Sequence, residues 1–403
     1  MSAGNKSIRL CILTEFFYPD SASGTGKVVS EIARKLADEH GFQVDVLTGR
    51  RGYLSGEILE AQTNWNGVRI WRGSFPNWNR QGVLKRTLGN LKLVSAIGSK
   101  ILKSRPYDVI LTTTAPPFMP MAARLAKHRR GTPYAYLIYD LEPDRATRIG
   151  AVNAKSRPTQ MLRRAQRKWL NDSNVVIAIG RCMKALIERE YGVDPNRVKF
   201  VPVGAPTSAF EPAAGSDGEL TIVYSGNLGR YHDFDTLLDA AKQLECNRFS
   251  IRIVGKGAKR EHIESRLATE DFPNVSISDP LDLKEYQALL SETDVAFVTM
   301  EEGIEGTCVP SKFYSIMASG KATVAVAGKE SELAYTIQEN DCGIVVAPGD
   351  RDGLVEAFET LANDRERCRN MGVRAREAFA QKYSTDTTIA QLAAILTKIA
   401  LPK

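Results

Sequence analysis

Residues 309–350 read VPSKFYSIMASGKATVAVAGKESELAYTIQENDCGIVVAPGD, and this stretch decides the fold. A helical pattern, FYSIMASG, leads into the short apolar run ATVAVAG at 322–328. A second helical pattern then leads into the run GIVVAP at 343–348. Short β-branched runs that alternate with helices and end at glycine or proline are typical of a parallel sheet with crossover helices. The stretch therefore predicts an α/β fold.

The same alternation extends along the whole chain of 403 residues, a length that suits two α/β domains. Further strand-like runs lie at 8–14, 43–49, 108–114, 134–140, 174–180, 220–226, 250–257, 275–280 and 294–300. Between the two groups, residues 201–219 are rich in proline, glycine, alanine and serine and have no periodicity, as expected of a linker. We predict an N-terminal domain over 1–204, a C-terminal domain over 205–384, and a terminal helix over 385–403 that packs back on the first domain.

The composition argues against several classes of protein. The six cysteines are dispersed without a C-x-x-C pair, and the four histidines have no metal-ligand spacing, so we expect neither a zinc site nor a disulfide framework. No run of about 18 apolar residues occurs, and the N-terminus lacks the pattern of a signal peptide. We expect a cytoplasmic protein that needs no metal and no cofactor.

Two basic segments without acidic residues, 80–105 and 155–168, account for much of the net charge of +7. They predict an anionic partner, and because aromatic residues are not interleaved with the charges, nucleic acid is disfavoured. We expect the apolar residues of the first segment to pack on their own domain: Leu84, Leu88, Leu91 and Ile101. The charges suit the inner face of an anionic membrane, and they suit an ordinary solvated helix equally well.

Glycine loops follow three of the predicted strands. Gly24 and Gly26 follow the first strand, and Gly226 and Gly229 open the second domain just before Arg230. The next loop contains Gly255, Gly257 and Lys259. Glycine lets a backbone approach a ligand closely, and a helix N-terminus favours a phosphate. Each loop could also be a plain turn, but two consecutive loops with basic residues favour phosphate binding.

Three further features bear on chemistry. Ser311 and Lys312 open a helix, where the helix dipole disfavours a lysine unless an anion is bound beside it. Asp140, in YDLEPD, could orient an acceptor hydroxyl or cap a helix. Two D-x-D strings, at 233–235 and 350–352, start helical patterns, so we predict helix caps there rather than metal ligands.

Taken in order, YPDSASGTG, YDLEPD, YSGNLG, IVGKG and VPSKFYSIMASGKATVAVA resemble the retaining glycosyltransferases of family 4. The resemblance covers essentially the whole chain and is greatest to the branch found in bacterial exopolysaccharide and O-antigen assembly. It implies the GT-B fold, in which two Rossmann-like domains face each other across a cleft. It also implies a nucleotide-sugar donor, UDP- or GDP-linked, and a hydroxyl acceptor that is a glycan or is lipid-linked.

The resemblance implies a role for each motif residue. Gly24 and Gly26 would lie over the donor phosphates, and Lys312 would neutralise the pyrophosphate. The remaining donor contacts would come from Gly226, Asn227, Arg230, Lys259, Asp279, Leu281, Ser311 and Glu332. The chain departs from the family where two glutamates are usual, at Thr307 and Ser315, and where arginine and lysine are usual, at Asn227 and His232.

Two other classes of function stay open at this stage. A dinucleotide-dependent oxidoreductase would need a third glycine where Val29 stands and an acidic residue at the end of the second strand, where Thr48 and Gly49 stand. A non-catalytic module could bind an anionic membrane through the basic segments, but the glycine loops would then have no purpose.

Overall fold

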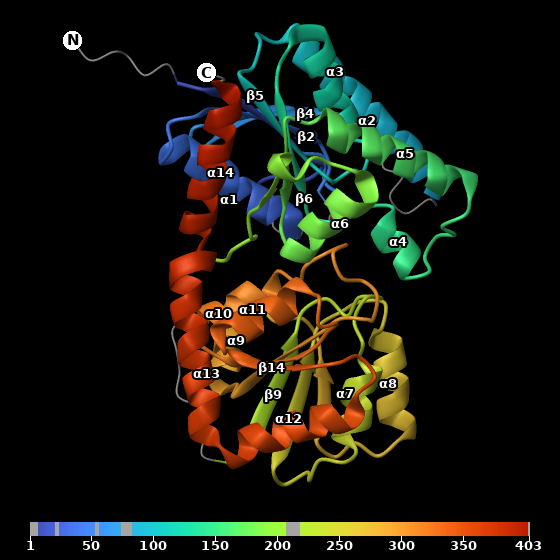
Figure 1. Ribbon diagram of the computed structural model, residues 1–403, viewed down its shortest axis with the longest axis vertical. Coiled ribbons are helices and arrows are strands. Elements are labelled where there is room, and N and C mark those ends of the chain that lie inside the picture. Colours follow the sequence, from blue (N-terminus) through green and yellow to red (C-terminus); the bar gives the residue numbers. More distant parts are fainter. Residues whose placement is uncertain (1–6, 21–23, 53–55, 74–82, 207–217, 402–403) are drawn as a thin grey trace, which may run out of the picture. The chain divides into compact units, whose positions relative to one another are not determined.

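The computed structural model describes residues 7–20, 24–52, 56–73, 83–206 and 218–401. The chain forms two compact units (Figure 1). Unit 1 comprises residues 1–145, 152–202 and 389–403, and unit 2 comprises 146–151 and 203–388. Most of the predicted linker lies outside the described residues.

Unit 1 is built on an eight-stranded sheet in the order β3-β4-β2-β1-β5-β6-β7-β8. Every pair is parallel except β3 with β4. The strands are β1 Arg9–Leu13, β2 Gln43–Gly49, β3 Gln62–Trp65, β4 Val68–Gly73, β5 Val109–Thr113, β6 Tyr134–Ile138, β7 Val175–Ala178 and β8 Val198–Phe200. All residues of β5, β6 and β7 are buried, as expected where helices cover both faces of a parallel sheet.

Helices lie on both faces of this sheet (Figure 1). They are α1 Gly24–Asp38, α2 Val83–Lys103, α3 Pro120–Arg130, α5 Arg157–Asp172 and α6 Arg181–Tyr191. The short helix α4 Asp144–Arg148 is divided between the units, because the chain up to Arg145 belongs to unit 1 and Ala146 belongs to unit 2. The last helix, α14 Thr385–Ala400, belongs to unit 1 from Ile389 onward.

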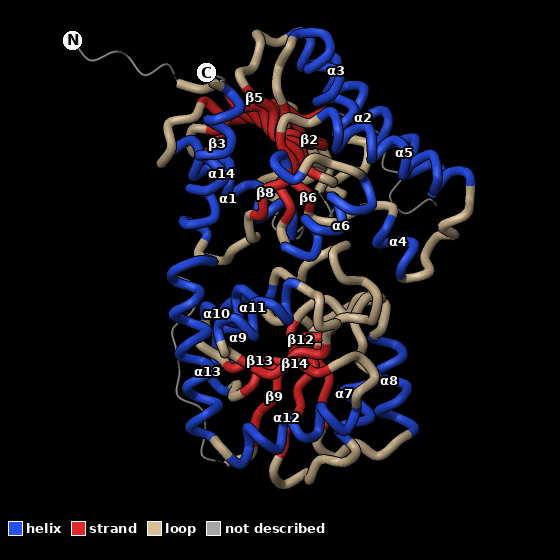
Figure 2. The backbone as a smooth tube through the Cα atoms, in the orientation of Figure 1, coloured by secondary structure: helices blue, strands red, loops and turns tan. Residues whose placement is uncertain are grey.

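Unit 2 contains a six-stranded, fully parallel sheet in the order β11-β10-β9-β12-β13-β14 (Figure 2). The strands are β9 Leu220–Ser225, β10 Phe249–Val254, β11 Val275–Ser278, β12 Val295–Thr299, β13 Ala322–Val326 and β14 Gly343–Val346. The helices are α7 Asp235–Ala241, α8 Arg260–Thr269, α9 Leu283–Glu292, α10 Lys312–Ala318, α11 Glu332–Asn340, α12 Arg351–Asn363 and α13 Arg365–Ala378. The core of β9, β12 and β13 includes Ile222, Phe297 and Val324.

The predicted fold class is confirmed, and each predicted strand-like run contains a strand. The D-x-D strings lie at helix starts, as predicted: Asp350 is the N-cap of α12, and Asp233 lies one residue before the N-cap of α7. Asp233 Oδ1 accepts from Thr236 N at 3.0 Å, and Asp350 Oδ1 accepts from Gly353 N at 2.9 Å. Within the described ranges, no helix has the length and apolar character needed to cross a bilayer.

The prediction for α2 is only partly right. Ile101 is buried as expected, but Leu88 and Leu91 are 45% and 37% exposed. The helix turns Leu93, Val94 and Ile97 toward the core instead. The buried stripe therefore lies on a different face of the helix from the one on which Leu88 and Leu91 lie. The side chain of Leu84 and residue Arg80 lie outside the described part.

Candidate functional site

The sheet of unit 2 has a topological switch point. From β9 the chain goes to β10 on one side, and β12 joins β9 on the other side. In doubly wound sheets, ligands bind outside the carboxyl ends of the strands at such a point. The loops that follow β9, β10, β12 and β13 all leave from this edge.

Two glycines let the loops after β9 and β10 pack backbone to backbone. A Cβ atom on Gly255 would lie 1.9 Å from Gly226 O, and one on Gly257 would lie 2.3 Å from Leu228 O. Leu228 N donates to Lys256 O at 2.9 Å, and Lys259 N donates to Leu228 O at 2.9 Å. Only glycine permits this approach, so these loops form one fixed structure and are more than flexible turns.

Lys312, the first residue of α10, reaches into this structure. The Cβ atom that Gly226 lacks would lie 2.8 Å from Lys312 Nζ, so glycine at 226 leaves room for the ammonium group. Nζ lies 3.6 Å from the centroid of the Tyr224 ring. Although the residue as a whole is partly exposed, Nζ itself is buried and has no hydrogen-bond partner among the described residues. Desolvation by this burial lowers the pKa of Lys312 to about 7.

His232, at a position where the family usually has lysine, has a structural role here. Its buried ring makes a 2.6 Å hydrogen bond from Nδ1 to Thr299 O, which requires Nδ1 to be the donor. Burial lowers the pKa of His232 to about 3, and the charge of Lys312 adds to this effect. The imidazole is therefore neutral, and Lys312 is the group placed to meet an anion.

The other residues predicted in the loops of unit 2 differ in how strongly they are held. Arg230 is exposed and makes no ion pair within the described part of the chain. Asn227 is also exposed; its Nδ2 donates to Tyr231 Oη at 3.2 Å, and its carbonyl accepts from Tyr224 Oη at 2.6 Å. Lys259 forms a 2.8 Å ion pair with Glu301, so its charge is already partly balanced.

The remaining predicted contacts lie on the rim of the same edge or in the helix after β13. Asp279 is exposed and pairs with Arg260 at 2.8 Å, and Leu281 packs beside the buried Leu289. Ser311 is exposed ahead of α10. Glu332 begins α11 and is buried; its Oε1 accepts from Thr336 Oγ1 at 3.2 Å.

Sequence reasoning missed Glu305 in this unit. A Cβ atom on Gly328 would lie only 2.0 Å from Glu305 Oε1, so the carboxylate lies against the backbone where the chain leaves β13. The available signal was a glycine directly after a strand, which often marks the close approach of another group.

In unit 1, the predicted residues lie near the carboxyl ends of β1 and β6. Gly24 is the exposed first residue of α1, and Gly26 is buried in the same turn, so this glycine pair belongs to a helix and not to a loop. Asp140 follows β6, and its Oδ1 lies 3.6 Å from Arg145 Nε. Burial raises the pKa of Asp140 and Arg145 lowers it; because 48% of the side chain is exposed, solvent moderates the effect of burial.

Glu15, directly after β1, was also missed. Its side chain is buried, and Oε1 has no hydrogen-bond partner in the described structure. Burial raises the pKa of Glu15 to about 7. In the described part of each unit, a buried ionisable group near the carboxyl edge of the sheet therefore lacks a hydrogen-bond partner: Lys312 in unit 2 and Glu15 in unit 1.

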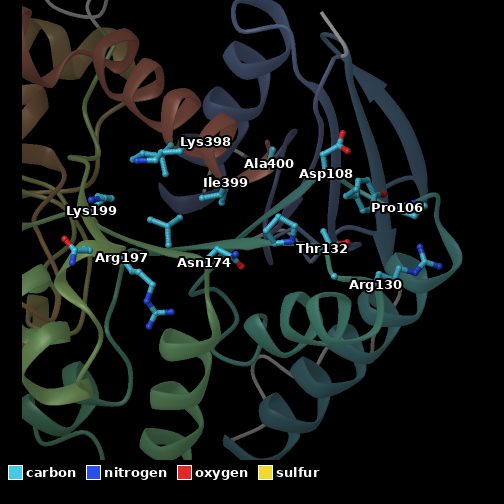
Figure 3. Close-up of a pocket in the computed structure, with 16 residues that line it drawn as sticks. Pro106, Asp108, Arg130, Thr132, Asn174, Arg197, Lys199, Lys398, Ile399 and Ala400 are labelled. Carbon is cyan, nitrogen blue, oxygen red and sulfur yellow. The ribbon is translucent and has the colours of Figure 1, made fainter. Parts of the chain in front are cut away.

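A cavity of about 660 Å³ in unit 1 lies at the opposite, amino-terminal ends of β5, β6, β7 and β8 (Figure 3). Two of the basic residues that line it already make hydrogen bonds within the protein: Arg197 donates to Asn171 O and Ser173 O, and Arg130 donates to Ser104 O. None of the residues predicted for the site lines this cavity. Among the described residues, no group of three or more His, Cys, Asp and Glu side chains could hold a metal ion.

Two family models together match most of the chain. Residues 23–204 match the glycosyl transferase 4-like domain, and residues 208–378 match the glycosyl transferases group 1. Among curated proteins, the chain is 26% identical over 332 residues to a probable glycosyltransferase, WbjE, of Pseudomonas aeruginosa, covering 79% of this chain and 82% of the relative. It is 24% identical over 340 residues to WcaI of Escherichia coli K12, named as a putative colanic acid biosynthesis glycosyl transferase, covering 78% and 83%.

Solved structures share the fold. Sucrose-phosphate synthase from Thermosynechococcus elongatus superposes with a TM-score of 0.79 at 16% identity, covering 97% of this chain and 99% of that one. HepE of Anabaena, in complex with UDP-glucose, superposes with a TM-score of 0.69 at 14% identity, covering 97% and 100%.

Proposed function

Because this chain belongs to the GT-B glycosyltransferases of family 4, we propose that it moves a hexose from a UDP- or GDP-sugar to a hydroxyl acceptor with retention of configuration. Unit 2 would bind the donor and unit 1 the acceptor. The single observation that carries the donor side of this proposal is the buried Nζ of Lys312, which has no hydrogen-bond partner in the described structure and lies at the switch point of the unit 2 sheet.

A diphosphate fits the surroundings of Lys312, whose Nζ has no hydrogen-bond partner among the described residues. A buried amine with no partner is held in its neutral form by desolvation, and an incoming anion reverses that balance. The diphosphate would supply the hydrogen-bond acceptor that Nζ lacks, and the Tyr224 ring already offers its negative face to the ammonium group. The UDP-glucose complex of the structural relative HepE supports the choice of ligand class.

Other residues complete the proposed donor site. Arg230, exposed and unpaired in the described structure, would place its guanidinium on the phosphate oxygens. Gly226 and Asn227 would line the pocket, and Asp279 and Leu281 would flank the base. Lys259, Ser311 and Glu332 would act at the edges of the site. Gly24 and Gly26, in the first turn of α1, would offer backbone N–H groups to the phosphates.

The chemistry needs no metal in this proposal. The bond from the anomeric carbon to the leaving phosphate oxygen breaks, and the acceptor oxygen bonds to the same face of that carbon. The acceptor proton passes to the leaving phosphate oxygen, so no strong base from the protein is required. Lys312 and Arg230 stabilise the charge on the departing diphosphate, and contacts of this kind are worth roughly 2–4 kcal/mol each. Asp140 would orient the acceptor hydroxyl.

Thermal unfolding with a nucleotide panel tests the proposal, because a ligand that binds the native state raises the unfolding midpoint. The panel is UDP, GDP, ADP, TDP and NAD, each with and without EDTA. We expect a rise with UDP or GDP that EDTA does not change and that Lys312→Ala abolishes. A rise with NAD alone would indicate the oxidoreductase instead, and no rise with any nucleotide would refute the donor site.

A peripheral membrane contact is a second proposal, and it would suit an acceptor that is lipid-linked. Exposed apolar side chains lie among basic ones on α2 and α5: Leu88 and Leu91 on α2, and Met161, 67% exposed, on α5. Apolar residues in a basic surface favour an anionic bilayer. Replacing Leu88, Leu91 and Met161 with serine should reduce co-sedimentation with anionic liposomes, and unchanged co-sedimentation would exclude the contact.

A further inference from the structure

The backbone of Glu15 is hydrogen-bonded to the ends of two neighbouring strands, β2 and β5, at the carboxyl edge of the unit 1 sheet. Its N–H donates to Ala115 O at 2.7 Å, just past β5. Its carbonyl accepts from Gly49 N at 3.1 Å and from Thr48 Oγ1 at 2.9 Å, at the end of β2. The residue therefore sits between the ends of β2 and β5, at the edge where ligands bind in such sheets.

In the described structure, no hydrogen bond explains why the side chain of Glu15 is buried. It is only 4% exposed, and Oε1 is fully buried without a hydrogen-bond partner. Burying a carboxyl group in this way costs stability, and buried polar groups in native proteins nearly always have partners. An unpaired buried group needs an explanation, and at the ligand-binding edge of a sheet a ligand can supply the missing hydrogen bond.

Other polar groups accompany Glu15 along this edge. Thr114 Oγ1, one residue before Ala115, accepts from Tyr139 N at 3.4 Å and from Asp140 N at 3.5 Å. The Tyr139 hydroxyl is buried and also has no partner in the described part of unit 1. A buried carboxyl group, a buried phenol and the carboxylate of Asp140 thus follow β1 and β6, the two strands that flank β5 in the sheet.

The charges around Glu15 restrict the class of ligand. The positive charge of Arg86, on α2, acts on Glu15 and lowers its pKa, while burial raises that pKa more strongly, to about 7. Near neutral pH Glu15 is thus present both as a carboxylate, which accepts hydrogen bonds, and as a carboxylic acid, which can also donate one. Arg86 disfavours a cationic ligand there, and the Glu15 carboxylate disfavours an anionic one. Neutral hydroxyl groups fit both conditions.

We propose that Glu15 is an acceptor-positioning residue, whose carboxyl group hydrogen-bonds a hydroxyl of a neutral sugar held at the carboxyl edge of the unit 1 sheet. The inference rests on the proposed transferase function. It adds Glu15 to the acceptor site, and it predicts a polyhydroxylated acceptor that carries no charge at the hydroxyl held by Glu15.

Carboxyl-labelled glutamate in the full-length protein allows a test that needs neither the natural donor nor the natural acceptor. The ¹³C resonance of Glu15 is identified as the one missing in Glu15→Gln. The probes are the methyl α- and β-glycosides of glucose, galactose and mannose, at millimolar concentrations. We expect at least one of them to shift the Glu15 resonance in a saturable manner. If none shifts it, the proposal is overturned.

Variants separate positioning from a structural role. By saturation-transfer NMR, Glu15→Leu should weaken binding of the same glycoside about fivefold or more, since one hydrogen bond is lost, and Glu15→Gln should retain part of it. Glu31→Gln, a control on α1 whose side chain is 34% exposed and pairs with Arg34, should bind as the wild type does. Equal binding by Glu15→Leu and the wild type would overturn the proposal. UDP or GDP binding, measured in parallel, reports on the donor site of unit 2, so a failure there counts against the proposed function and not against Glu15.

Discussion

Lys312 Nζ lies over the face of the Tyr224 ring, 3.6 Å from its centroid, in a space that exists because residue 226 is glycine. The ring, the glycine and the helix that starts at Lys312 come from two widely separated parts of the chain. Together they bury an amine that has no hydrogen-bond partner among the described residues. An arrangement of this kind destabilises the free protein slightly and is relieved when an anion binds.

Substitutions at Tyr224 should separate the contribution of the aromatic ring from that of the hydroxyl group. Tyr224→Phe loses the hydrogen bond to Asn227 O and should cost about 1 kcal/mol of unfolding free energy, with little change in UDP or GDP affinity. Tyr224→Leu removes the aromatic face below Lys312 and should weaken the nucleotide by roughly 0.5–2 kcal/mol as well. Urea unfolding and calorimetric titration measure the two effects. Equal affinity losses in both variants would argue against a role for the ring.

Gly255→Ala should destabilise unit 2 severely. The added methyl group would lie 1.9 Å from Gly226 O, and the backbone at Gly255 has a φ of 152°, which alanine rarely adopts. We expect a loss of roughly 2–5 kcal/mol in urea unfolding. The matched control is Gly218→Ala, where a Cβ atom meets no heavy atom within 4 Å. A Gly255→Ala variant as stable as this control would show that the two loops are not locked together.

Arg230→Ala should affect binding without affecting stability. The side chain is exposed and unpaired within the described residues, so the unfolding free energy should change by less than about 0.5 kcal/mol. Losing a charge-assisted contact with phosphate should weaken UDP or GDP binding about tenfold to a hundredfold. Scanning calorimetry measures the stability, and titration calorimetry measures the nucleotide affinity. An affinity equal to that of the wild type would remove Arg230 from the donor site.

Glu15 should make stability depend on pH. Its pKa is 4.5 when unfolded and about 7 when folded, so folding takes up a proton between these values and wild-type stability falls as pH rises through that window. The full effect is roughly 3 kcal/mol. Glu15→Gln lacks it, so the variant should gain stability relative to the wild type between about pH 5 and pH 8. Urea unfolding at both pH values measures this difference, and a constant difference would show that the Glu15 carboxyl group is not desolvated.

Most of the fold could be predicted because the central strands are apolar on both faces and end at glycine, proline or aspartate. The exceptions lie outside that pattern. The hairpin β3–β4 was missed, since NWNGVRIWRG mixes polar and aromatic residues as an edge hairpin does. Its Asn66–Gly67 turn, with positive φ at both residues, was a signal that could have identified it.

The site was less predictable, for physical reasons. A lysine at a helix start identified Lys312, but its desolvation depends on Tyr224 and Gly226, which only the folded sheet brings to it. Glu15 and Glu305 are single acidic residues without a motif, and their significance lies in burial and close contact. Leu88 and Leu91 were expected in the core because periodicity shows that a helix has an apolar stripe, while tertiary packing decides which residues face inward.

The central claim is that Lys312 becomes charged when it meets the donor diphosphate, and proton uptake during binding tests this most directly. UDP and GDP are titrated calorimetrically at about pH 8 in two buffers of different ionisation enthalpy, where Lys312 is mostly neutral in the free protein. We predict uptake of close to one proton per nucleotide bound by the wild type and by the exposed-lysine control Lys284→Met, and a large loss of affinity in Lys312→Met. Binding without proton uptake, or with an affinity that Lys312→Met leaves unchanged, would contradict the account.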